Sequence, residues 1–95
     1  MPTRMTDYAT EHERVLERAN SIFLDMSKVR GQMWLEFPPS DKIRELVERA
    51  RRLEHAYVAY EEGDESVAAI VINDALDIIN YAAFLIKQVE RGMHG

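Results

Sequence analysis

The sequence predicts an all-α fold of three long antiparallel helices, and three observations support this prediction. Apolar residues recur at alternating steps of three and four along two segments, which is the spacing of one helix face. A third segment, residues 67–89, is apolar around almost its whole circumference, as is typical of a buried helix. Gly31 and Gly63 separate the segments, and no convincing strand or internal repeat is present. We therefore expect one helical domain over residues 1–95.

The composition limits the classes of function. A chain of 95 residues, 46% of them hydrophobic, suffices for a single domain or for part of one completed by oligomerisation. The net charge of −5 argues against nonspecific binding to nucleic acid or to an anionic membrane surface. The sequence has no cysteine, which excludes disulfides and thiolate chemistry. Residues 1–10 lack the apolar core of a secretion signal, so we expect a soluble, cytoplasmic protein.

The first helix is predicted over residues 6–30. Its apolar positions are spaced four, three, four, three and four residues apart: Val15, Ala19, Ile22, Met26, Val29 and Met33. This spacing is typical of a helix that packs lengthwise against others. Gly31 is expected to end the helix in a left-handed cap, because glycine adopts a positive φ without steric cost.

The connector over residues 32–39 is unusually apolar, since it contains Trp34, Leu35 and Phe37 beside a proline pair. A segment of this composition is expected to fold back onto the helices rather than to extend into solvent. Two roles remain open for Trp34, either as a hydrophobic plug over the bundle or as a platform on which a ligand ring stacks.

The second helix is predicted over residues 40–62, with Ser40 as its N-cap and Asp41 favourable in the first turn. Its apolar positions are spaced three, four, three, four and three residues apart: Ile43, Leu46, Ala50, Leu53, Tyr57 and Tyr60. Glu54 lies on the same apolar side at helical spacing. Gly63 is expected to stop the helix.

The third helix is predicted over residues 66–91, capped by Asp64 or Ser66. Short connections between long helices imply antiparallel neighbours. One chain cannot cover a helix this apolar, so we expect homo-oligomerisation, as a dimer or a tetramer, to complete a larger helical bundle. The segment is long enough to cross a bilayer, but Asp74 and Asp77 argue against insertion, since each costs about 2.5–3.5 kcal/mol near the middle of a membrane helix.

A polar stripe runs along this apolar helix, formed by Asn73, Asp77 and Asn80 with Asp74 at its edge. Buried carboxylates are costly unless a partner compensates their charge. The two aspartates therefore require a metal ion, an arginine or the same stripe of another subunit.

Two interpretations of the acids remain open. Asp74 and Asp77, with Glu54 or Glu48 of the second helix, are oxygen ligands of the kind that suit Mg²⁺ inside a helical bundle. Alternatively, the aspartates pair with arginines of the second helix and lock the helix register. The candidate arginines are Arg49, Arg51 and Arg52.

Basic residues of the second helix also match the geometry of phosphate oxygens. The phosphate-binding candidates are Arg49, Arg52 and Lys42. A run of this kind is equally typical of an ordinary solvated helix face. The candidates for holding a nucleotide base are Asn80, Trp34 and Tyr81, although a tyrosine at this position also fits the core.

Four fragments carry a family resemblance. Residues 74–82 read as a "D-hydrophobic-x-NYA" helix, and residues 30–34, 49–53 and 65–66 resemble an "RGxxW" connector, a "KxxRL" helix and an "ES" helix entry. In this order they resemble a small phage-associated domain family, described as nucleotide-modification-associated or dATP/dGTP diphosphohydrolase-like. The resemblance spans about residues 30–89.

More remotely, Asp74-x-x-Asp77 is similar to the "ExxD" half of the MazG-like all-α nucleotide pyrophosphohydrolases. That resemblance implies magnesium held by acids on two helices and cleavage of a nucleoside triphosphate into a monophosphate and pyrophosphate. The other half of the pattern, "EExxE", is represented by Glu45-x-x-Glu48, with Arg44 at its leading position.

The expected function is therefore that of a nucleotide-binding, Mg²⁺-dependent nucleoside triphosphate pyrophosphohydrolase-like protein, with Asp77, Asp74 and Glu54 as catalytic acids. One alternative is a non-enzymatic homodimeric interaction module, in which the polar stripe fixes the register across the interface. The other is an accessory subunit that binds a nucleotide or a modified base without hydrolysing it.

Overall fold

The computed structural model describes residues 4–31 and 38–94. Its elements are α1 (Met5–Arg30), α3 (Pro39–Glu61), the 3₁₀ turn η1 (Glu65–Val67) and α4 (Ala68–His94). The described residues contain no strand, so the predicted all-α class is confirmed. Most of the predicted connector, including Trp34, lies outside the described residues.

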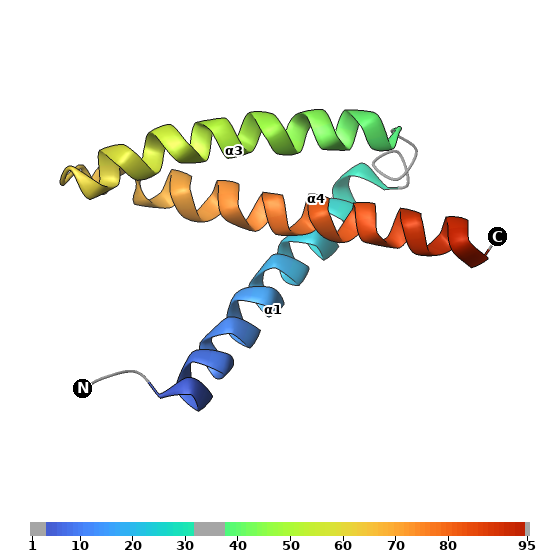
Figure 1. Cartoon of the computed structure of the whole chain (residues 1–95), viewed down its shortest axis with the longest axis horizontal. Helices are drawn as coiled ribbons and strands as arrows, with labels where there is room; N and C mark the ends of the chain where they lie inside the picture. Colours follow the sequence, from blue (N-terminus) through green and yellow to red (C-terminus); the bar gives the residue numbers. More distant parts are fainter. Residues whose placement is uncertain (1–3, 32–37, 95) are drawn as a thin grey trace.

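Helices α3 and α4 form an antiparallel hairpin that η1 closes at one end (Figure 1). Helix α1 packs on α4 and crosses it obliquely, and its N-terminal half extends away from the hairpin (Figure 1). The predicted antiparallel arrangement therefore describes α3 and α4 but not α1. A helix that crosses its neighbour buries only the part of its face near the crossing point.

Local backbone chemistry sets the first helix end and the start of α3. Gly31 ends α1 as predicted, but with a φ of +58° and a ψ of −145° it has a positive φ outside the left-handed helical region that the cap prediction implied. Helix α3 starts at Pro39, with Pro38 rather than Ser40 at the cap position and no side-chain cap bond. The predicted Ser40 cap is wrong because proline already has the φ of a first helical residue and no N–H that needs a cap.

The turn between α3 and α4 is built from the residues that the sequence indicates. Gly63 has a φ of +106°, which suits glycine and ends the helical path. The Asp64 side chain accepts a hydrogen bond from the Ser66 backbone N–H at 3.1 Å and caps η1. The third predicted helix thus begins as 3₁₀ turn, and α4 continues past residue 91 to His94.

The hydrophobic core is small and centres on two aromatic side chains of α4. Tyr81 is 4% exposed and Phe84 is 3% exposed. Half-buried side chains from all three helices surround them: Phe23, Met26, Leu46 and Leu85. Ala19 of α1 and Leu76 of α4 are also buried.

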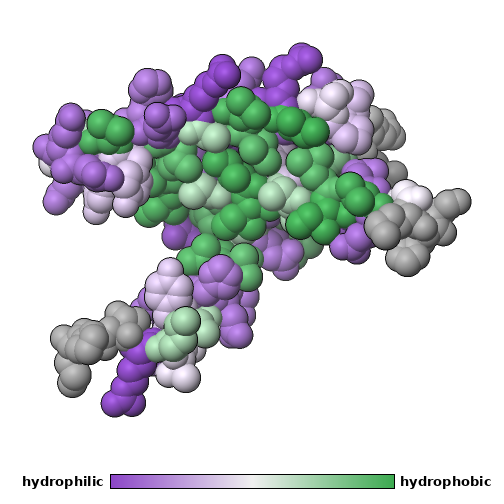
Figure 2. Space-filling view, viewed as in Figure 1, coloured by the Kyte–Doolittle hydropathy of each residue, from purple (hydrophilic) through white to green (hydrophobic). Residues whose placement is uncertain are grey.

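Much of the predicted packing surface is exposed in the single chain. On α1, Val15 is 45% and Val29 is 86% exposed, and on α3, Ile43 is 50% and Tyr57 is 48% exposed. The reason is that periodicity identifies the apolar side of a helix but does not fix the crossing angle or the edge that meets a neighbour. Figure 2 shows the apolar side chains gathered over α3 and α4.

The single chain is also more extended than its length predicts. It exposes 7644 Å², whereas a folded monomer of 11.0 kDa is expected to expose about 5600 Å². Its radius of gyration is 15.7 Å, against about 12.4 Å for a compact domain of this length.

The segment Glu65–Gly92 is long and apolar enough to cross a membrane, by length and composition alone. The core helix of a soluble protein passes the same test when its neighbours bury it. Here 22% of the most apolar window is buried within the chain and most of its other residues are half-buried, so one copy of the chain covers this helix only in part.

Candidate functional site

The polar residues of α4 meet α3 in a row of contacts along the hairpin. Arg52 binds Asp74 through two contacts: Nε donates to Oδ2 at 2.7 Å, and Nη2 donates to Oδ1. Asp74 is 1% exposed, whereas 62% of the Arg52 side chain is exposed. The guanidinium group therefore compensates a buried carboxylate while its outer edge stays in water.

The next contacts lie one turn further along both helices. Arg49 Nε donates to Asp77 Oδ2 at 3.1 Å, and Arg49 Nη1 lies 3.6 Å from Glu45 Oε2. The Tyr81 hydroxyl donates to the same Glu45 oxygen at 2.5 Å. The guanidinium carbon of Arg49 also lies 5.0 Å from the centre of the Tyr81 ring. These four side chains form one connected network.

We call the three pairs Glu45–Tyr81, Arg49–Asp77 and Arg52–Asp74 the polar ladder. Each step of four or three residues along α3 is matched by an equal step back along α4, as an antiparallel pair requires. A shift of one helical turn would break all three pairs: in one direction Asp74 is left buried without a cation, and in the other Glu45 comes to face Asp77, and both outcomes are costly. The polar ladder therefore fixes the register of the hairpin.

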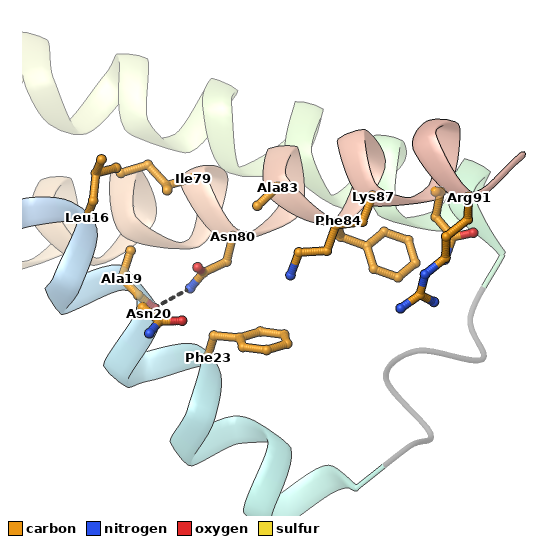
Figure 3. A pocket seen from close by; sticks show the side chains of 11 residues that line it. Leu16, Ala19, Asn20, Phe23, Ile79, Asn80, Ala83, Phe84, Lys87 and Arg91 are labelled. Atoms are coloured by element: carbon orange, nitrogen blue, oxygen red, sulfur yellow. Dashed lines mark hydrogen bonds between the residues drawn. The ribbon is translucent and has the colours of Figure 1, made fainter. Parts of the chain in front are cut away.

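Asn80 faces α1 instead of the polar ladder. Its Nδ2 donates to the Ala19 carbonyl oxygen at 3.0 Å (Figure 3). The small, buried Ala19 side chain allows the two helix backbones to approach, and the amide then ties α1 to α4 at their crossing. The Asn80 side chain, a predicted contact for a nucleotide base, therefore already donates to a partner within the protein.

The polar ladder shifts two titrations. Hydrogen bonding from Arg52 lowers the pKa of Asp74 and outweighs burial, which acts in the opposite direction. Burial raises the pKa of Tyr81 to about 12, and the hydrogen bond to Glu45 adds to the shift. Asp74 therefore stays ionised and Tyr81 stays a neutral donor at physiological pH.

The structure brings some predicted site residues together and leaves others apart. Those that meet in the polar ladder are Asp74, Asp77, Arg49, Arg52 and Tyr81. Glu54 and Glu48 are exposed on α3. Within residues 4–31 and 38–94, no three Asp, Glu, His or Cys side chains form a group suited to a metal ion. The predicted Mg²⁺ ligand set is therefore not assembled in the described part of the chain.

The remaining candidates occupy different surroundings. Lys42 is 3% exposed, and its ammonium group lies 5.9 Å from the Tyr81 ring centre and 5.5 Å from the Phe84 ring centre. This position suits cation–π packing within the hairpin rather than an open phosphate site. Arg51 and Asn73 are exposed, and the predicted base platform Trp34 lies outside the described residues.

Sequence reasoning missed the role of Glu45, which accepts the Tyr81 hydroxyl and contacts Arg49. The signal was present in the spacing. Along α3, successive members of the polar ladder are four and three residues apart. Their partners on α4 have the same spacing in the opposite direction of the chain. Matching such intervals between neighbouring helices identifies all three pairs of the polar ladder together.

Chemically, the polar ladder holds each carboxylate against a guanidinium group or a hydroxyl, which is typical of a structural lock.

No family model, curated protein or solved structure matches this chain. The relation to the phage-associated and MazG-like families therefore stays a prediction, and function has to be inferred from the geometry of the chain itself.

We predict that the Asp74 contact makes the fold sensitive to acid. The pKa of Asp74 is lower in the folded chain than in the unfolded chain, so the contact stabilises the fold above about pH 4, and this stabilisation is lost as the pH falls through the folded-state value. Asp74→Asn should cost about 1.5 kcal/mol at neutral pH and flatten the fall in unfolding free energy from about pH 5 to 2. Urea unfolding across this range measures both effects.

The matched control for this prediction is Asp25→Asn, the same substitution at an exposed position of α1. It should follow the pH profile of the unmodified chain. Identical profiles for Asp74→Asn and the unmodified chain would show that the carboxylate is not held by Arg52.

We expect millimolar Mg²⁺ to leave the Tm of the chain unchanged, because guanidinium groups already neutralise Asp74 and Asp77. Thermal unfolding and pyrophosphate release, each with a panel of dNTPs, measure this, with NaCl at equal ionic strength as the control. A rise in Tm or a turnover that requires Mg²⁺ and disappears in Asp77→Asn would instead support the metal-dependent interpretation.

Proposed function

We propose that this protein is a homodimeric helical interaction module, in which two copies pack together along the apolar face that α4 leaves open in each α3–α4 hairpin. The observation that carries the proposal is an apolar stripe of α4 that the single chain covers only in part: its alanines and Ile79 are half-buried, and Ile72, Ile86 and Val89 are exposed. This stripe, the α4 seam, consists of Ala68, Ile72, Ala75, Ile79, Ala82, Ile86 and Val89.

The α4 seam has the heptad spacing of helices that pack lengthwise, with alternating steps of four and three residues. Isoleucine fills one heptad position at 72, 79 and 86, and alanine fills the other at 68, 75 and 82. Ile72 is 42% exposed, Ile86 is 58% exposed and Val89 is 64% exposed. Apolar side chains in this repeating arrangement are stabilised when a second helix covers them.

The surface of the single chain is large enough for a stable interface. It exceeds the surface expected of a compact monomer of this mass by about 2000 Å². If each partner buries an area of this order, the total lies in the range of about 2000–5000 Å² that obligate homodimers bury. Because the apolar side chains in Figure 2 are contiguous over α3 and α4, they form a patch rather than scattered exposed residues.

The projecting half of α1 supports the same conclusion. Residues 4–18 are all exposed, including Met5 at 81% and Tyr8 at 62%. A helical segment of this length with few tertiary contacts is marginal in water. Contacts with a second protomer supply the neighbours that this segment lacks in the single chain.

The composition of the α4 seam favours an antiparallel pairing of the two α4 helices. In a parallel pair, alanine would face alanine and isoleucine would face isoleucine, so tight and wide layers would alternate. In an antiparallel pair, each alanine faces an isoleucine, and every layer has a similar volume. A two-fold axis near the middle of the α4 seam, close to Ile79, satisfies this arrangement.

The contacts of the aspartates favour this module over the predicted hydrolase. Asp74 and Asp77 are paired with Arg52 and Arg49, so the groups proposed to bind metal and phosphate engage one another. A water-soluble dimer also accounts for the apolar character of α4 without a bilayer. The pyrophosphohydrolase interpretation stays a prediction that the nucleotide and Mg²⁺ measurements described above test.

We predict that a charge on the α4 seam breaks the dimer. Ile86→Glu should raise the dimer dissociation constant by about 100-fold or more, because the interface would bury an unpaired carboxylate. The position is 58% exposed in the single chain, so the helical fold of the protomer should persist. Sedimentation velocity gives the mass, and circular dichroism confirms that the helices remain.

The matched control is Val58→Glu, a similar substitution at a 52% exposed position of α3 outside the α4 seam, which should leave the dimer intact. Three results would overturn the proposal: a monomeric unmodified chain at all accessible concentrations, equal loss of dimer in both variants, or flotation of the unmodified chain with phosphatidylcholine vesicles.

A further prediction concerns the orientation of the two helices, and the absence of native cysteine makes it simple to test. In an antiparallel dimer, Ile79→Cys should react with its own copy through a short bismaleimide, because both thiols lie near the two-fold axis. Ile86→Cys should not, because its copies are separated by several helical turns. Equal cross-linking of both variants would indicate a parallel pair.

A further inference from the structure

A groove lies between α1 and α4, beside the point where the two helices cross (Figure 3). It encloses about 440 Å³, which is within the usual range of small-molecule sites. Phe23 of α1 and Phe84 of α4 contribute aromatic rings to its wall. Ile79 of the α4 seam lies at the edge of this groove, and the other described residues that line it belong to neither the polar ladder nor the α4 seam.

The charge of the groove is opposite to that of the protein. Lys87 and Arg91, one turn apart on α4, direct their charged groups toward the groove (Figure 3). Among the described residues that line it there is no Asp or Glu, although the chain as a whole has a net charge of −5. Within the described residues, no carboxylate forms an ion pair with either cation. Two cations that pair with no described carboxylate favour an anionic occupant.

The apolar part of the groove favours a planar occupant. The Lys87 ammonium group lies 4.9 Å from the centre of the Phe23 ring, so cation and ring are adjacent parts of one surface. Aromatic rings stack on flat ligands and add specific contacts beyond the area that they bury.

Two neutral polar side chains, Asn20 and Asn80, also line the groove. Asn20 is exposed at the wall of the groove and has both a donor and an acceptor to offer. Asn80 is held in place by its bond to the Ala19 carbonyl oxygen, which joins the two walls of the groove near the crossing.

We propose that the groove between α1 and α4 binds a small anion with a planar aromatic body. The anionic group lies against Lys87 and Arg91, and the ring lies against the half-buried Phe23. A nucleoside monophosphate and an aromatic carboxylate both have this chemistry, and they are separate arms of the test.

The test is a titration of the full-length chain followed by amide NMR shifts, with dissociation constants for each probe. One arm compares AMP with adenosine and with inorganic phosphate, and the other compares indole-3-acetate with indole. At least one aromatic anion should bind about tenfold more tightly than its neutral parent and than phosphate alone. Its shifts should centre on Asn20 and on the last turns of α4.

The double variant Lys87→Met/Arg91→Met should remove this tenfold preference, because it deletes both charges and keeps side chains of similar length. The matched control is Lys28→Met/Arg51→Met, which changes the net charge equally at exposed positions outside the groove. The control should bind as the unmodified chain does.

The two arms of the titration identify which anionic group the groove prefers. Preference for AMP alone assigns phosphate as the anionic group, and preference for indole-3-acetate alone assigns carboxylate. Equal binding of charged and neutral probes, no binding of any probe, or equal loss in both double variants would overturn the proposal. The same titration is repeated with Ile86→Glu, which is expected to be monomeric. Binding by this variant would show that the groove does not depend on the dimer, so the two proposals can fail independently.

Discussion

The contact between Arg52 and Asp74 constrains the whole hairpin, because it is the means by which α4 can carry a fully buried charge. Once this pair forms, the equal spacing of the two helices brings Arg49 to Asp77, and Glu45 to Tyr81, without further adjustment. A buried ion pair adds little net stability compared with apolar packing, but its loss on a shift of register is costly. The main effect of the Arg52–Asp74 pair is therefore to exclude other registers of α3 against α4, which apolar contacts alone would not distinguish.

The unusual composition of α4 follows from its central position. One side carries the polar ladder against α3, a second side meets α1 through Asn80, and a third side carries the α4 seam. A helix with a neighbour on each of three sides is expected to be apolar nearly all round. Two of these neighbours belong to the same chain, and the proposed dimer provides the third.

The sequence allowed the helices and the main polar contacts to be predicted, but not their arrangement in space. Periodic apolar residues located the helices, and the cost of burying charge showed that Asp74 needs a partner. The choice between metal and arginine stayed open, because periodicity does not define helix rotation well enough to place Glu54 or Arg52 against α4. The crossing of α1 was missed because its heptad pattern suits both lengthwise and oblique packing. The α4 seam was not predicted, because no single stripe differs from its surroundings in a helix that is apolar almost all round.

The single crossing of α1 over α4 has a consequence for the order of folding. The hairpin joins segments that are close in sequence through the short turn at Gly63, so its closure costs little chain entropy. The contact between Ala19 and Asn80, in contrast, closes a loop of most of the chain. The hairpin therefore assembles first and α1 docks afterwards. In the native state, the backbone amides in the N-terminal half of α1 exchange their hydrogens with water through local fraying, far sooner than those at the centre of α4.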